Sequence, residues 1–147
     1  MAFRDTTKKP FIEDRDTNVF IGIDYPFHRS DGSQGWFAST DTTIKAVKNN
    51  VRMLLSTYPG ERLFQPTIGI GLQKFLFEQF TPDTRIAIEN EIVDAFNLWL
   101  PFVEIKELEV EMIGNDPIGK NKLSIYVAFN IIRDPNTLES VQVEIGD

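Results

Sequence analysis

Apolar side chains recur at helical spacing in two long segments. The first follows Thr40 or Asp41, either of which could cap a helix, and ends before Pro59 and Gly60. Its apolar stripe comprises Ile44, Val47, Val51, Leu54 and Leu55, and its polar face, which we expect to meet solvent, comprises Lys45, Lys48, Asn49 and Arg52. The second segment starts at Thr81-Pro82-Asp83, a strong helix start, and Pro101 stops it. Its apolar face comprises Ile88, Ile92, Ala95, Phe96 and Trp99. A shorter helix is predicted over residues 72–79, with Leu72, Phe75, Leu76 and Phe80 toward the core.

After Pro101 the apolar period becomes two, which is typical of strands. Strands are predicted over residues 103–112, with a slip near Glu107 that suggests a bulge, over residues 122–132 and over residues 138–145. Turns are predicted at residues 114–119 and 134–137, and another strand at residues 18–24. The order predicts an α+β fold, in which two or three helices pack against a small antiparallel sheet with a C-terminal three-strand meander.

The remaining segments complete the predicted organisation. Residues 1–17 are polar without a steady period, so we expect an extended N-terminal arm, followed by a single α+β domain over residues 18–147. Residues 25–39 have the composition of a loop, with Trp36 and Phe37 expected to anchor it to the body of the domain.

Composition and charge exclude several function classes. The net charge of −7 would repel a phosphate backbone, so we expect no nucleic-acid partner. No apolar run is long enough to span a bilayer, so we expect no membrane partner. Cysteine is absent, which fits a reducing cytoplasm, and the lone His28 leaves few histidine-based mechanisms, so we expect no cofactor and no metal. His28 is most simply a loop residue.

Residues 50–78 carry a motif that points to a known family. A helix ends in Gly60-Glu61-Arg62, a loop with Pro66-Thr67-Ile68-Gly69 and Gly71 follows, and a short helix ends in Leu76-Phe77-Glu78. This run resembles the lysozyme-like baseplate wedge protein family of contractile-tailed bacteriophages, which is related to a baseplate component of type VI secretion. The resemblance extends over roughly residues 41–145.

The resemblance implies a structural, non-enzymatic virion protein of the tail baseplate, assembled in the host cytoplasm. It implies three kinds of partner, namely other baseplate wedge proteins, the tail sheath protein and tube-proximal baseplate proteins. It also implies that the C-terminal strands template sheath assembly. We expect residues 138–145 to offer an edge for β-augmentation, with an imperfect alternation of the apolar residues Leu138, Val141, Val143 and Ile145.

The segment after the long helix departs from the family pattern. Many family members carry Glu-Pro-Arg there, whereas this chain has Trp99-Leu100-Pro101-Phe102. Only the proline is kept, so the charged contact that the motif makes in relatives is not expected, and an apolar contact could replace it.

Several of these residues have competing interpretations. Glu61 and Arg62 either stabilise their own turn, which we favour, or contact a wedge partner. Gly69 and Gly71 favour close backbone approach over phosphate binding, because no P-loop lysine and serine follow. The alternative function is a peptidoglycan-degrading, lysozyme-like tail enzyme, which needs two carboxylates at a defined separation. Nothing in the spacing of Glu61, Glu78, Asp83 and Glu104 picks out such a pair. An adaptor domain outside phage tails fits the composition, but the motif argues against it.

Overall fold

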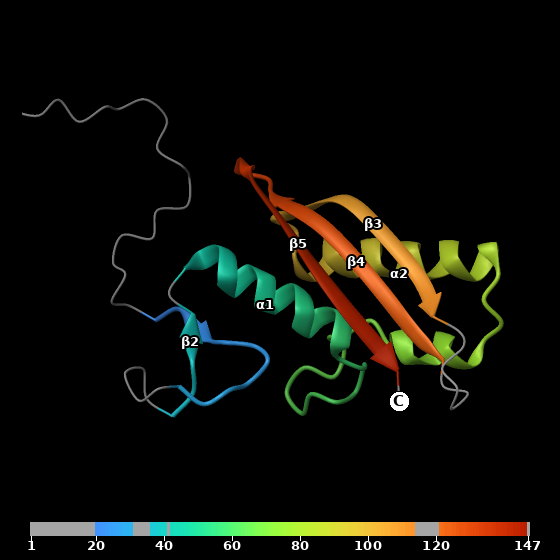
Figure 1. The fold of residues 1–147 in the computed structure, drawn as a ribbon, viewed down its shortest axis with the longest axis horizontal. Helices are drawn as coiled ribbons and strands as arrows, with labels where there is room; N and C mark the ends of the chain where they lie inside the picture. Colours follow the sequence, from blue (N-terminus) through green and yellow to red (C-terminus); the bar gives the residue numbers. More distant parts are fainter. Residues whose placement is uncertain (1–19, 31–35, 41, 114–120, 147) are drawn as a thin grey trace, which may run out of the picture.

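The computed structural model describes residues 20–30, 36–40, 42–113 and 121–146 (Figure 1). The predicted arm at residues 1–17 and the predicted turn at residues 114–119 lie outside them. Along the chain the elements are β1 (Gly22–Ile23), β2 (Ser39–Thr40), α1 (Thr43–Ser56), the 3-10 helix η1 (Leu72–Phe77), α2 (Pro82–Trp99), β3 (Val103–Ile113), β4 (Lys122–Ile131) and β5 (Asp134–Gly146). The predicted α+β class with a C-terminal three-strand meander is confirmed. None of the helices in the described ranges is long and apolar enough to cross a membrane.

The main sheet has the order β3-β4-β5, and both pairs of neighbouring strands are antiparallel. The register between β3 and β4 shifts between Ile105 and Glu107, which confirms the predicted bulge. Because of the extra residue, Ile105 and Leu108 both lie on the packed side of β3. Glu104 and Glu107 lie on the opposite, solvent side.

The core fills one face of this sheet. Figure 1 shows α2 passing behind β3 and β4, while α1 lies next to β5. β4 is central, and its inward residues Leu123, Ile125, Val127 and Phe129 are completely buried. Each such side chain contributes about 1.5–3 kcal/mol through burial. Apolar packing therefore holds the helices on the sheet.

The two long helices form largely as predicted, but only one has the predicted cap. The hydroxyl oxygen of Thr81 accepts a hydrogen bond from the Thr84 amide at 3.2 Å, and α2 follows. Helix α1 begins at Thr43, after Thr42, whose side chain makes no capping hydrogen bond. The prediction of Thr40 as a cap is wrong, because Thr40 pairs with β1 as part of β2; Asp41 lies outside the described residues.

The turn before β5 differs from the prediction. The chain reverses at Ile132 and Arg133 rather than over residues 134–137, and β5 already begins at Asp134. The turn chemistry that the sequence indicated produces an irregularity within the strand instead. The register shifts between Asn130 and Ile131, where the Thr137 hydroxyl donates to the Asp134 carbonyl oxygen at 2.7 Å.

Residues 20–40, predicted as a strand followed by a long loop, form a hairpin over their described parts. β1 is only two residues long and pairs with β2, and an isolated bridge joins Arg29 to Phe37. The prediction that Trp36 and Phe37 anchor this segment is wrong, since 81% and 55% of their surfaces are exposed. Instead of these two aromatic side chains, polar side chains on α1 hold the hairpin.

Candidate functional site

The loop between α1 and η1 carries the first half of the motif and is closed by its own hydrogen bonds. The Glu61 carboxylate accepts the Tyr58 amide at 3.0 Å, and the Gly60 amide donates to the Pro66 carbonyl at 2.8 Å. The Glu61 carboxylate thus caps its own turn, as the structural interpretation predicted. Pro66 is exposed and contributes its backbone to the loop.

Gly69 and Gly71 let this loop return against the end of α1. Gly69 has φ +120°, and a Cβ there would lie 2.4 Å from the Thr57 carbonyl oxygen. Gly71 has φ +68°, and its Cβ would lie 3.1 Å from Pro59 Cδ. The predicted close backbone approach is confirmed for both glycines. This approach allows the Ile70 amide, between the two glycines, to donate a hydrogen bond to the Thr57 carbonyl oxygen at 3.2 Å.

The returning loop borders an open pocket of about 210 Å³, which we call the corner pocket. It is lined by Asn50, Met53, Leu54, Thr57, Arg62, Ile68, Trp99 and Leu100. Arg62 and Trp99, both singled out in the sequence, are therefore brought together from the loop and from α2. Both are half-buried. Among the described residues Arg62 has no acidic partner, because the carboxylate of its neighbour Glu61 binds the Tyr58 amide instead.

The segment that departs from the family pattern closes one end of this pocket. Leu100 is buried and lines the pocket, while Pro101 and Phe102 are exposed. The Val103 amide donates to the Leu100 carbonyl at 2.9 Å, so the chain turns sharply into β3.

The second half of the motif lies elsewhere on the surface. Phe77 and Glu78, at the end of η1, are exposed and do not line the corner pocket. Leu63 and Phe64, which the sequence interpretation did not select, are 93% and 97% exposed at the loop tip. Their position directly after Glu61-Arg62 was the available signal, but residue type alone predicts burial.

The predicted edge residues on β5 divide between its two faces. Val141 and Ile145 are buried and Val143 is half-buried, on the side that faces the helices. Leu138 is 67% exposed and lies on the outward side, which accounts for the imperfect alternation in the sequence. An even-numbered residue cannot share a strand face with Val141. Glu139 takes the inward position, and its carboxylate lies 2.8 Å from Lys48 Nζ on α1.

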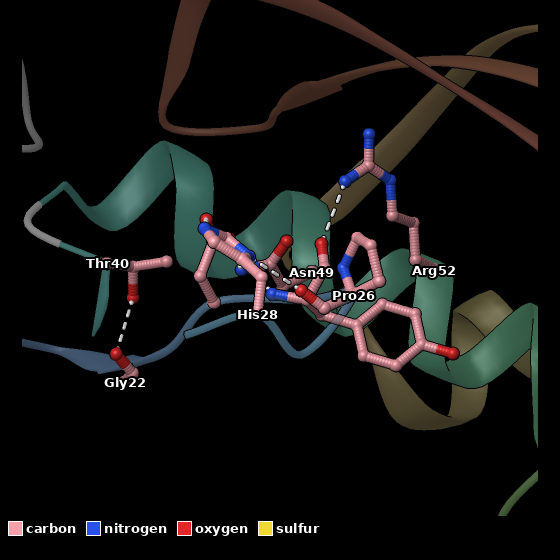
Figure 2. A network of polar contacts seen from close by, with 8 residues as sticks. Gly22, Pro26, His28, Thr40, Asn49 and Arg52 are labelled. Atoms are coloured by element: carbon pink, nitrogen blue, oxygen red, sulfur yellow. Dashed lines mark hydrogen bonds and ion pairs between the residues drawn. The ribbon is translucent and has the colours of Figure 1, made fainter. Parts of the chain in front are cut away.

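A polar network joins the hairpin to α1 (Figure 2). Asn49 Nδ2 donates to Asp24 Oδ1 at 2.9 Å, and Arg52 Nη1 donates to the Tyr25 carbonyl at 3.1 Å. Within the hairpin, the Thr40 hydroxyl donates to the Gly22 carbonyl at 3.2 Å. The predicted solvent exposure of Asn49 is wrong, because it is buried. Sequence offered no signal for this role, since its partner lies far away along the chain.

The Asp24 carboxylate is the one group in this network with a clear electrostatic signature. Its pKa lies below the ordinary value, chiefly because the Asn49 amide donates to it, with further lowering from the Tyr25 amide and the nearby His28 and Lys45. Partial burial opposes this change. The ionised form is therefore the one that holds the hairpin.

Comparisons with known proteins identify a family and two solved structures of the same fold. The model of a family described as baseplate wedge protein gp25 matches residues 42–136. Baseplate wedge protein gp25 of Enterobacteria phage T4 is 26% identical over 103 residues, which cover 70% of this chain and 75% of that protein.

Two solved structures share the fold. One, described as a candidate tail lysozyme from Geobacter sulfurreducens, has a TM-score of 0.55 and 23% identity, covering 72% of this chain and 90% of its own. A chain of the anti-feeding prophage baseplate has a TM-score of 0.54 and 20% identity, covering 83% of this chain and 81% of its own. At these identities both show the fold alone.

Proposed function

The chain belongs to the baseplate wedge protein gp25 family, and we propose that it joins the wedge of a contractile tail baseplate to the tail and templates the first sheath subunits. Family membership supports a structural role in the virion baseplate. The proposed partners are other wedge proteins, the tail sheath protein and tube-proximal baseplate proteins, with assembly in the host cytoplasm. The proposal includes no nucleic acid, membrane or cofactor.

The uninterrupted outer edge of β5 is the observation that favours sheath templating. Among the described residues β5 pairs only with β4, and its register runs without a break from Leu138 to Gly146. The opposite edge, on β3, is interrupted by the bulge at Lys106 and carries a row of glutamates, Glu104, Glu107, Glu109 and Glu111. Bulges and charges protect an edge against strand addition, so β5 is the better acceptor for an incoming strand.

Cysteine cross-linking tests which edge the sheath uses. The chain has no cysteine, so Gln142→Cys on the exposed face of β5 introduces a single thiol. Neighbouring strands bring Cβ atoms within disulfide distance only at opposed positions. When cysteines are scanned along the extended segments of the sheath protein, we expect a disulfide at the one position opposite residue 142 and none at the positions around it.

Glu109→Cys on β3 is the matched control, because Glu109 is also exposed and lies on the same face of the sheet, since both residues pair with Tyr126. Cross-links at Glu109→Cys in place of Gln142→Cys would move the template to the other edge. Baseplates assembled without this chain that still start full-length sheaths would refute templating altogether.

The enzyme alternative has a direct test. Purified protein is incubated with peptidoglycan, and released muropeptides are measured for the wild type and for Glu61→Gln. We expect no release, because the Glu61 carboxylate is engaged by the Tyr58 amide within its own turn. Release that disappears in Glu61→Gln would overturn the structural assignment.

A further inference from the structure

Arg62 is the one charged residue that the structure places in the lining of the corner pocket, which is otherwise largely apolar. Met53, Leu54, Ile68 and Leu100 supply the apolar lining, and Trp99 supplies an aromatic face. No carboxylate of the described residues pairs with Arg62, and the nearest acid in sequence, Glu61, is held by the Tyr58 amide. A half-buried cation beside apolar surface gains more from a carboxylate than a fully solvated cation does.

From this arrangement, and resting on the proposed wedge role, we propose that the corner pocket receives an aspartate or glutamate side chain of another wedge protein. The carboxylate forms a forked pair with the Arg62 guanidinium, and an adjoining apolar side chain packs against Trp99 and Ile68. The chain's net charge of −7 disfavours a general acidic surface as partner. The proposed contact therefore consists of one ion pair, at Arg62, surrounded by apolar packing.

The geometry of the pocket also explains why the acid must come from outside. Leu100 occupies the position at the end of α2 that faces this space, and the other residues of the lining are neutral. Leu100→Glu would place a carboxylate in the same pocket as Arg62. That variant should satisfy the guanidinium internally and compete with the partner.

The first test measures binding to the wedge proteins of the same baseplate, co-expressed with this chain. Arg62→Met keeps the apolar stem and removes the charge; we expect affinity to fall about 30-fold or more, as when one partner of a desolvated charge pair is truncated. Arg62→Lys keeps the positive charge but cannot form two parallel hydrogen bonds to the carboxylate, so its affinity should fall less than that of Arg62→Met. Leu100→Glu should weaken binding as Arg62→Met does. Thermal unfolding shows that each variant is folded.

A second test is independent of the wedge proteins. 4-Phenylbutyrate, an apolar carboxylate, is titrated into the wild-type protein while the indole N–H of Trp99 is followed by NMR. Trp36, exposed on the hairpin, is the internal reference. We expect a saturable shift at Trp99 that is absent with 4-phenylbutyramide and absent in Arg62→Met.

The outcomes separate the two proposals. If the wild type binds the wedge proteins and Arg62→Met binds within twofold of it, the carboxylate pocket is refuted and the wedge role stands. If the wild type binds none of them, the wedge role fails. In that case the titration alone tests the carboxylate pocket. An unchanged Trp99 signal, or an equal shift with 4-phenylbutyramide, would refute carboxylate binding there.

Discussion

The body of the molecule, from α1 to β5, and the hairpin before it are held by different forces. In the body, side chains from three helices bury the inner face of the sheet, and β4 is almost entirely enclosed. The hairpin is joined to α1 through directional polar contacts centred on Asp24 and Asn49. Its own large apolar side chains remain largely exposed, namely Phe20, Ile21, Ile23, Phe27, Trp36 and Phe37.

The family model begins where the hairpin ends. It covers residues 42–136, which include α1, η1, α2, β3 and β4 but only the first residues of β5. Non-directional apolar burial stabilises the shared body by large amounts, whereas the hairpin depends on a few hydrogen bonds of modest net value. We therefore expect the hairpin to open locally while the body remains folded.

The largest expected effect is in the core of the body. Phe129 is completely buried at the centre of the sheet, so Phe129→Ala should lower the free energy of unfolding by about 3–5 kcal/mol. Guanidinium denaturation followed by circular dichroism measures the change. A loss below about 1 kcal/mol would mean that the sheet is not the main source of stability.

The second largest effect is expected in the loop between α1 and η1, where stability depends on backbone geometry rather than on burial. Gly69→Ala should cost about 1–3 kcal/mol from its positive φ alone, and more because the new Cβ meets the Thr57 carbonyl. Gly60→Ala is the control, since Gly60 also has a positive φ but nothing within 4 Å of its Cβ position. Equal losses of stability in the two variants would show that the close approach of Gly69 to the Thr57 carbonyl does not contribute to the free energy of unfolding.

A smaller effect is expected where the hairpin meets α1. Asn49→Ala removes the hydrogen bond to the Asp24 carboxylate, and because that carboxylate is partly exposed we expect a cost of about 1.5 kcal/mol. The loss should appear as faster hydrogen exchange at the Ile21 and Asp24 amides, which bond to β2 and Ala38. Exchange at β4 amides should change much less. If it rises equally, the hairpin does not open independently of the body.

The smallest effect is a pH dependence confined to the hairpin. The pKa of Asp24 is lowered in the folded protein, so its stabilising contribution is complete above the ordinary aspartate pKa, about 3.9, and is lost as the pH falls through the folded value. NMR shifts of the Tyr25 amide should report this titration. In Asp24→Asn the acid transition should vanish, and its persistence would assign it to another group.

Much of the body could be predicted because its determinants are local. The period of Val47, Val51 and Leu54, the cap at Thr81 and the bulge near Glu107 each depend on residues close together in the sequence. The anchor role of Trp36 and Phe37 was mispredicted for one reason. Apolar character predicts burial, but both side chains are exposed, and no surface of the described residues buries them.

The sequence by itself determined the helices, the three-strand meander and the motif that marks the family, because periodicity and turn chemistry act over short distances. Only the tertiary structure decided that Asn49 binds Asp24 and that Arg62 meets Trp99 in one pocket. It also decided that β5 offers the uninterrupted edge. Each of these depends on how helices and strands distant in sequence are packed, and packing is set by the summed burial of the whole core.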